Sequence, residues 1–269
     1  MLVDTHAHLD FPDYAADLPL ALERAEAAGV TRIINISTSL ASSLRSVALA
    51  EAHPSIFAAV GVHPCYVDDS PEDIRAPLQS LLGHPKVVAL GETGLDYHRA
   101  ADPPEDAGAR ALWKANRLRQ ANFFRVQLEL AEEHGLSVVV HQRDSWEDTL
   151  EILRPYGGRV KAVFHCFGGT LAQAEELLAL GFCVSFTGIV TFKNAALVHE
   201  TAARLPAVSF FLETDCPFLA PVPHRGNRCE PAHTRLVAER IAQLRGESLE
   251  ELAAHTTAAA NAFFRRTDR

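Results

Sequence analysis

The sequence predicts an α/β fold, a (β/α)₈ TIM barrel in a single domain over residues 1–269. Apolar runs rich in β-branched residues alternate with amphipathic segments along the whole chain. Because these runs are apolar throughout, they indicate strands buried on both faces, as in a parallel sheet covered by helices. The length of 269 residues fits a barrel of roughly 250 residues. No GxGxxG or GxxxxGK[ST] motif follows a strand, which disfavours a nucleotide-binding sheet.

Eight apolar runs are the candidate strands, and helical segments follow them in order. The predicted strands are Leu2–Thr5, Thr31–Ser37, Ile56–Val62, Val87–Leu90, Ser137–Val140, Val160–Phe164, Phe182–Phe186 and Val208–Thr214. The predicted helices are Leu18–Ala28, Leu40–Ala52, Pro71–Leu82, Leu112–His134, Trp146–Leu153, Leu171–Leu180, Ala195–Leu205, Ala232–Leu244 and Ser248–Phe264. Gly29, Gly135 and Gly181 each precede a strand and mark the ends of helices.

One segment departs from this alternation. Tyr97–Ala111 contains Pro103, Pro104 and Gly108 together with several charged residues, which is typical of a long loop. It follows the fourth strand, so we expect it to project over the carboxyl end of the barrel. There it would narrow access to a site and favour single strands or frayed ends over intact duplex.

Composition limits the classes of function. Lys plus Arg is 25 and Asp plus Glu is 34, and the formal charge of −9 argues against non-specific coating of nucleic acid. No run of about 18 apolar residues predicts a membrane span, and the N-terminus lacks the basic start of a signal peptide. The five cysteines form no CxxC pair, which favours a reducing compartment. We therefore expect a cytoplasmic protein with no membrane contact and no obligate protein partner.

Polar side chains gather where the predicted strands end. His6 and His8 follow the first strand two residues apart, so both imidazoles point to the same side. An HxH pair alone is weak evidence in a chain with 13 histidines. The carboxyl ends of later strands add further candidate ligands: Glu92, His141, His165 and Asp215. In a TIM barrel these ends surround one mouth, so four imidazoles and two carboxylates would suit one or two divalent ions.

These segments resemble the TatD-type DNases, a family of metal-dependent hydrolases with a TIM-barrel fold. The resemblance covers nearly the whole chain and rests on these motifs: HAHLD at His6, GVHP at His63, GETGLDY at Glu92, VVVHQRDS at His141, FHCFGG at His165 and ETDCPFLAP at Asp215. It implies metal ligands at His6, His8, Glu92, His141, His165 and Asp215, with His63 close to the site on the substrate side. The chain departs from the family pattern in the longer stretch after GLDY and in Cys229, where Asn is common.

The resemblance implies exonucleolytic hydrolysis of DNA phosphodiester bonds with two divalent ions of the Mg, Mn or Zn type. Such a pair activates water and stabilises the charge that develops on a phosphoryl group. Glu92 would bridge the two ions, and Asp215 would bind metal and orient or deprotonate the attacking water. Arg143 is the first candidate for a phosphate contact, because its guanidinium is a planar fork. Further candidates are His98, Lys193, Arg225 and Arg228.

Two alternatives stay open. The same barrel could hydrolyse a small amide, ester or lactone, as in the broader amidohydrolases. Many of those bridge their metals with a carboxylated lysine at the carboxyl end of a strand, whereas Lys86 and Lys161 lie at the starts of strands here. A non-catalytic metal-binding or scaffold protein is the third reading, which the complete ligand set disfavours.

Overall fold

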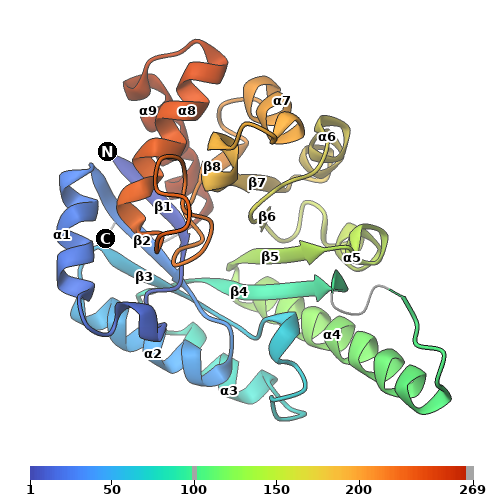
Figure 1. Ribbon diagram of the computed structural model, residues 1–269. Coiled ribbons are helices and arrows are strands. Elements are labelled where there is room, and N and C mark those ends of the chain that lie inside the picture. The colour runs from blue at the N-terminus through green and yellow to red at the C-terminus, as the bar shows by residue number, and fades with distance from the viewer. Residues whose placement is uncertain (99–101, 265–269) are drawn as a thin grey trace.

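The computed structural model describes residues 1–98 and 102–264 and confirms the predicted barrel (Figure 1). Eight parallel strands follow one another in sequence order around a single sheet. They are β1 (Leu2–Ala7), β2 (Val30–Ile36), β3 (Ile56–Val60), β4 (Val87–Asp96), β5 (Ser137–Arg143), β6 (Ala162–Phe164), β7 (Cys183–Phe186) and β8 (Phe210–Leu212). The circle closes where Ala7 and the His8 N–H meet Cys216, just beyond β8.

Helices surround the strands on the outside of the barrel (Figure 1). They are α1 (Leu18–Ala27), α2 (Leu40–Ala52), α3 (Arg75–Leu82), α4 (Ala107–His134), α5 (Trp146–Leu153), α6 (Leu171–Ala179), α7 (Ala196–Arg204), α8 (Thr234–Arg245) and α9 (Leu249–Phe263). Gly29, Gly135 and Gly181 adopt positive φ angles of 86°, 63° and 82° before their strands, as the sequence predicts. Every residue of β3 is buried, because its two faces meet the barrel interior and the helices.

The amino end of the barrel is filled by the last turn of α9. Phe263 and Phe264 pack against the inward side chains of several strands, among them Ile34 and Phe211. The Ser137 hydroxyl at the start of β5 donates to the Phe263 carbonyl at 2.6 Å. This end is therefore occupied by core side chains, and polar groups gather at the carboxyl end instead.

Several element boundaries differ from the sequence prediction by a few residues, and the two largest differences concern α4 and β4. The helix α4 begins at Ala107, so the predicted loop is wrong for residues 107–111; the Asp106 side chain caps the helix by accepting from the Ala109 N–H at 2.8 Å. Strand β4 continues to Asp96, because its second half pairs with β5. Residues 99–101 of the predicted loop lie outside the described residues. No described helix is long and apolar enough to cross a membrane.

Candidate metal centre

The side chains that follow β1 and β8 are anchored to each other by Asp4. This buried carboxylate accepts hydrogen bonds from the backbone N–H groups of His6 and Thr214, at 3.2 and 3.0 Å, and from the Thr214 hydroxyl at 2.7 Å. The Asp215 N–H in turn donates to the His6 carbonyl at 2.9 Å. Burial raises the pKa of Asp4 to about 7. Asp4 therefore fixes the first and last strands in the register that brings His6 beside Asp215.

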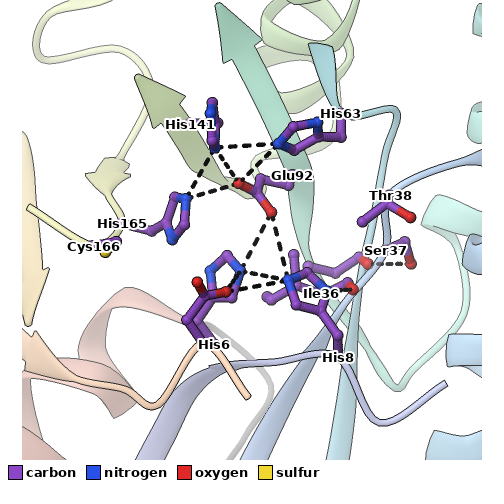
Figure 2. A network of polar contacts seen from close by, with 12 residues as sticks. His6, His8, Ile36, Ser37, Thr38, His63, Glu92, His141, His165 and Cys166 are labelled. Atoms are coloured by element: carbon purple, nitrogen blue, oxygen red, sulfur yellow. Dashed lines mark hydrogen bonds and ion pairs between the residues drawn. The ribbon is translucent and has the colours of Figure 1, made fainter. Parts of the chain in front are cut away.

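One cluster of ligand atoms forms between these two strands. The Nε2 atoms of His6 and His8 lie 3.2 Å apart, and each lies close to Asp215 Oδ1, at 3.5 and 3.4 Å. Glu92 Oε2 completes the group at 3.3 Å from His6 Nε2 and 3.8 Å from His8 Nε2 (Figure 2). Three of these residues, His6, His8 and Asp215, have the spacing expected of a metal site.

A second cluster forms around the other oxygen of Glu92. His141 Nδ1 and His165 Nε2 each lie 2.7 Å from Glu92 Oε1, and they lie 3.2 Å from each other. Figure 2 shows Glu92 between the two groups, with His6 and His8 on one side and His141 and His165 on the other. The Glu92 side chain is only 3 % exposed, so its oxygens face the clusters rather than solvent. All six ligands predicted from the sequence thus meet at one place, and Glu92 has the position of a bridge.

Three imidazoles have an oxygen atom behind them, and for His8 and His141 this oxygen lies within hydrogen-bond distance. His8 Nδ1 lies 2.8 Å from the Ile36 carbonyl, and His141 Nε2 lies 3.1 Å from Asp96 Oδ2. His165 Nδ1 lies 3.6 Å from Glu213 Oε1. Carboxylates and carbonyls behind metal-bound histidines fix the orientation of the ring and the position of its proton. These contacts leave the opposite nitrogen of each ring facing Glu92 or Asp215.

The donor set fits divalent ions. His141 has carboxylates beside both ring nitrogens, and so does His165. A neutral imidazole has one hydrogen, so one nitrogen of each ring would bring a lone pair against a carboxylate oxygen. A cation between them, either a proton or a metal ion, removes that repulsion. Four imidazoles with carboxylates suit Zn or Mn better than Mg, which prefers oxygen ligands.

His63 approaches the second cluster closely, yet its hydrogen bonds indicate a different role. Its Nε2 lies 3.5 Å from Glu92 Oε1 and 3.2 Å from His141 Nδ1. Its Nδ1 accepts the Cys65 N–H at 3.0 Å, so a neutral ring must carry its hydrogen on Nε2. Burial lowers the pKa of His63 to about 3, which keeps the ring neutral. His63 therefore presents an N–H donor to the centre, as a substrate contact would.

The clusters lie at the base of a cavity of about 630 Å³, which we call the metal cavity. Phe11, Ile189, Phe218 and Leu219, which follow β1, β7 and β8, form an apolar wall of this cavity. No described residue of the predicted loop lines this cavity, although Asp96, just before it, does. The expectation that the loop narrows access to the metals thus has no support from the part of the loop that the structure describes.

Some of the side chains predicted to contact phosphate are already paired with carboxylates, and others are exposed and, within residues 1–98 and 102–264, unpaired. Arg228 is bound to Asp17 and Glu230, and His98 lies 2.7 Å from Asp144. Arg143 is exposed, lines the metal cavity, and has no ion pair among the described residues. Lys193 is also exposed. Cys229 is buried behind Tyr14, whose hydroxyl donates to the Cys229 carbonyl at 2.5 Å, and it does not line the metal cavity.

Sequence reasoning missed Asp96 and Glu213, the carboxylates behind His141 and His165. Both signals were present in the sequence. Asp96 follows Glu92 by four residues, and residues an even number apart on a strand share a face. Glu213 stands two residues before Asp215, but it lies deeper, where it accepts from the Ser185 hydroxyl and the Cys166 N–H, both at 2.6 Å.

A barrel with this ligand set at its carboxyl end defines the class of metal-dependent hydrolases, and the comparisons agree. The chain belongs to the TatD family, because the family described as TatD related DNase matches residues 3–265. An uncharacterized metal-dependent hydrolase, YabD of Bacillus subtilis, is 40 % identical over 98 % of this chain and 99 % of its own. The protein named 3′-5′ ssDNA/RNA exonuclease TatD of Erwinia tasmaniensis is 33 % identical over 98 % of this chain and 99 % of its own.

Solved structures show the same relationship. YJJV, a TatD homolog from Escherichia coli, superposes with a TM-score of 0.87 and 31 % identity over 98 % of this chain and 97 % of its own. The phosphotriesterase homology protein of Escherichia coli, at a TM-score of 0.65 and 14 % identity, shares the fold over 98 % of each chain. The chain is thus a metal-dependent hydrolase of the TatD family.

Protons and metal ions should compete for this centre. Burial by itself would lower the pKa of His165, but Glu92 and Glu213 raise that pKa well above its ordinary value; Asp96 and Glu92 likewise raise the pKa of His141. Because metal binding requires both rings to release protons, we expect metal affinity to increase with pH above 6.5 and to be lost below about pH 6. Equilibrium dialysis at a series of pH values measures this dependence.

The same shifts predict how the metal-free protein melts. An imidazole whose pKa is raised in the folded state stabilises that state fully below pH 6.5, the pKa in the unfolded chain. This stabilisation is lost as pH rises through the pKa of the folded state. The pKa values of His6 and His63 are lowered, so above pH 6.5 these rings are neutral in both states and add nothing. We therefore expect the Tm of the chelated protein to decrease above pH 6.5. A Tm that rises with pH over this range would contradict the assignment.

Proposed function

We propose that this protein is a metal-dependent nuclease that removes nucleotides from single strands or frayed ends of DNA. The observation that carries the proposal is Glu92, because one oxygen lies in each cluster of ligand atoms. A carboxylate in that position suits two ions side by side, the arrangement that many phosphodiester-cleaving enzymes use. The printed name of the Erwinia tasmaniensis relative, a single-strand exonuclease, supports the same substrate class.

Each residue of the centre has a role in this reaction. One ion would be held by His6, His8 and Asp215, the other by His141 and His165, with Glu92 between them. Two divalent ions bound there would supply an activated water and stabilise the charge that develops on the phosphoryl oxygens.

Three residues would act on the substrate and on the attacking water. Asp215, whose side chain is 14 % exposed, can accept a proton from the attacking water. The His63 Nε2–H would donate to a phosphoryl oxygen. Arg143 would bind a phosphate oxygen from the rim of the metal cavity.

Hydrolysis of a small ester, amide or lactone is the second candidate. The apolar wall of Phe11, Ile189, Phe218 and Leu219 favours it, because a small hydrophobic substrate would bury its surface there. The lysines disfavour it. Lys86 Nζ donates to the Pro54 carbonyl and Lys161 Nζ to the Ala262 carbonyl, both at the amino end of the barrel, far from any bridging position. Neither lysine is available to become a carboxylated ligand.

One assay separates the two candidates. The protein is incubated with single-stranded DNA, duplex DNA and a panel of esters and lactones, in Mn²⁺, in Mg²⁺ and after chelation. We expect metal-dependent degradation of the single strand, and we expect chelation to abolish activity and to lower the Tm, since ions that bind only the folded chain stabilise it. Full activity after chelation, or turnover of esters without any loss of DNA, would contradict the proposal.

We further propose that the protein works in the reducing cytoplasm. All five cysteines are free thiols, and Cys216 and Cys229 are buried. Burial raises the pKa of the Cys166 thiol to about 12, so this thiol beside the metal centre stays protonated and unreactive. Retention of all five thiols in protein purified without reductant, measured by thiol titration, supports this proposal.

A further inference from the structure

A second cavity of about 680 Å³ adjoins the metal cavity, and the proposed function does not yet use it. We call it the side cavity. Residues of both the β5–α5 and β6–α6 connections line it, so it lies at the carboxyl ends of β5 and β6. Gln142, Arg143, His165 and Cys166 line both cavities. The two cavities therefore share a wall that contains a predicted metal ligand.

Arg143 stands on that shared wall with an exposed side chain. In the part of the chain that the structure describes, it has no ion pair or side-chain hydrogen bond, whereas the neighbouring Asp144 is paired with His98. An unpaired guanidinium between two cavities can bind a phosphate that joins a group in one cavity to a group in the other.

Carboxylates elsewhere in the side cavity limit what its interior can accept. Asp144, Glu147 and Asp148 all contribute to its lining, and Asp148 accepts the Tyr97 hydroxyl at 2.9 Å. Arg117 also lines the cavity, stacked on the ring of Tyr97, but the three acids outnumber it and disfavour a phosphate inside. A nucleobase has no charge, and its N–H groups, such as N3–H of thymine, can donate to carboxylate oxygens.

Aromatic rings and an open glycine backbone provide the shape for such a base. Trp146, partly exposed, lies with its ring 6.5 Å from that of Phe167, and both rings line the cavity. Base–aromatic stacking is a general mode of binding single-stranded nucleic acid and tolerates any base. Gly168 lines the same cavity and is exposed, and a Cβ at this position would meet no atom within 4 Å. Space beside the rings is thus left free.

We propose that the side cavity is a subsite for the nucleotide adjacent to the scissile phosphodiester. Arg143 binds the phosphate that links the group in the metal cavity to the nucleotide in the side cavity. The base of that nucleotide stacks near Trp146. The inference rests on the proposed nuclease function and adds to it the direction of the strand, from the metal centre across β5 towards α5. A duplex cannot place a base there without unpairing it, which gives a structural reason for a preference for single strands.

Two glycines offer a matched test. Gly168→Leu adds a side chain inside the side cavity, and Gly83→Leu adds the same side chain just after α3, where a Cβ likewise meets no atom within 4 Å. Neither glycine has a positive φ, so both positions accept leucine without backbone strain. The substrates are a single-stranded octathymidylate and methyl 4-nitrophenyl phosphate, a diester small enough for the metal cavity alone. The measured quantity is kcat/KM for the octathymidylate divided by kcat/KM for methyl 4-nitrophenyl phosphate.

We expect the ratio to fall at least tenfold in Gly168→Leu and to stay within twofold of the unmodified protein in Gly83→Leu. Arg143→Gln should lower the ratio in the same direction. An unchanged ratio in Gly168→Leu, while the octathymidylate is still hydrolysed, would overturn the subsite and leave the nuclease function intact. If the unmodified protein hydrolyses neither phosphodiester, the proposed function fails and the subsite fails with it.

Tryptophan fluorescence gives a readout that does not depend on turnover. The chain has two tryptophans, so Trp113→Phe leaves Trp146 as the single reporter. A phosphorothioate octathymidylate, which resists hydrolysis, should quench this emission in a saturable manner, and Gly168→Leu should raise the concentration for half-quenching at least tenfold. Binding of the strand, measured by anisotropy, without any change in Trp146 emission would overturn the stacking position.

Discussion

Replacement of Asp215 by asparagine should leave the protein folded with at least one ion bound, yet lower kcat by at least about two orders of magnitude. The carboxylate lies 3.5 Å from His6 Nε2 and 3.4 Å from His8 Nε2, and it lines the metal cavity, where the proposed reaction takes place. Asparagine has nearly the same shape and also tolerates the positive φ of 57° at this position. What it lacks is the negative charge and the basicity that accept a proton. The loss should therefore appear in turnover rather than in stability.

The measurement combines steady-state kinetics on single-stranded DNA with metal analysis of the purified variant. Asp17→Asn serves as the control, because Asp17 binds Arg24 and Arg228 on the surface and does not line the metal cavity. Near-normal turnover in Asp215→Asn with normal metal content would show that Asp215 is only a structural acid. Loss of all metal would instead show that it is indispensable as a ligand.

The fold and the positions of the six predicted ligands follow from local patterns in the sequence. The strands could be recognised because apolar runs such as Ile56–Val60 are buried on both faces, and barrel geometry then gathers their carboxyl ends. The sequence also contains the family motifs around Glu92 and Asp215, so the resemblance and the physical reading point to the same side chains.

Features that depend on three-dimensional contacts were not accessible in this way. The tautomer of His63 depends on the Cys65 N–H, and the orientation of His141 depends on Asp96, a residue 45 positions away in sequence. Helix α4 starts after a cap at Asp106, which lies just beyond the two prolines, and it includes Gly108, which had suggested a longer loop. The side cavity depends on how the connections after β5 and β6 lie against each other, which no motif encodes.

Glu92→Gln should have the largest effect on the centre as a whole. Glu92 Oε1 lies 2.7 Å from both His141 Nδ1 and His165 Nε2, while Oε2 lies 3.3 Å from His6 Nε2. Despite burial, the surrounding imidazoles lower the pKa of Glu92 well below its ordinary value, so the carboxylate is charged at neutral pH. An amide has no charge and offers one acceptor atom, so it cannot serve both clusters. We expect the metal content to fall by at least one ion per chain and kcat/KM to fall at least about 10³-fold.

Glu213→Gln is the matched control, because it makes the same exchange in a buried carboxylate that lies behind His165 rather than between the clusters. Removing an outer partner of a ligand typically costs about 10–100-fold in metal affinity or activity, so this variant should bind both ions at saturating concentration. The two variants therefore distinguish a carboxylate that bridges the two ions, Glu92, from one that only orients a ligand, Glu213. If Glu92→Gln kept the metal content of the unmodified protein, and its Tm still rose on metal addition by the same amount, the ions would be held by two independent sites. Glu92 would then be a neighbour of the metals and not their bridge.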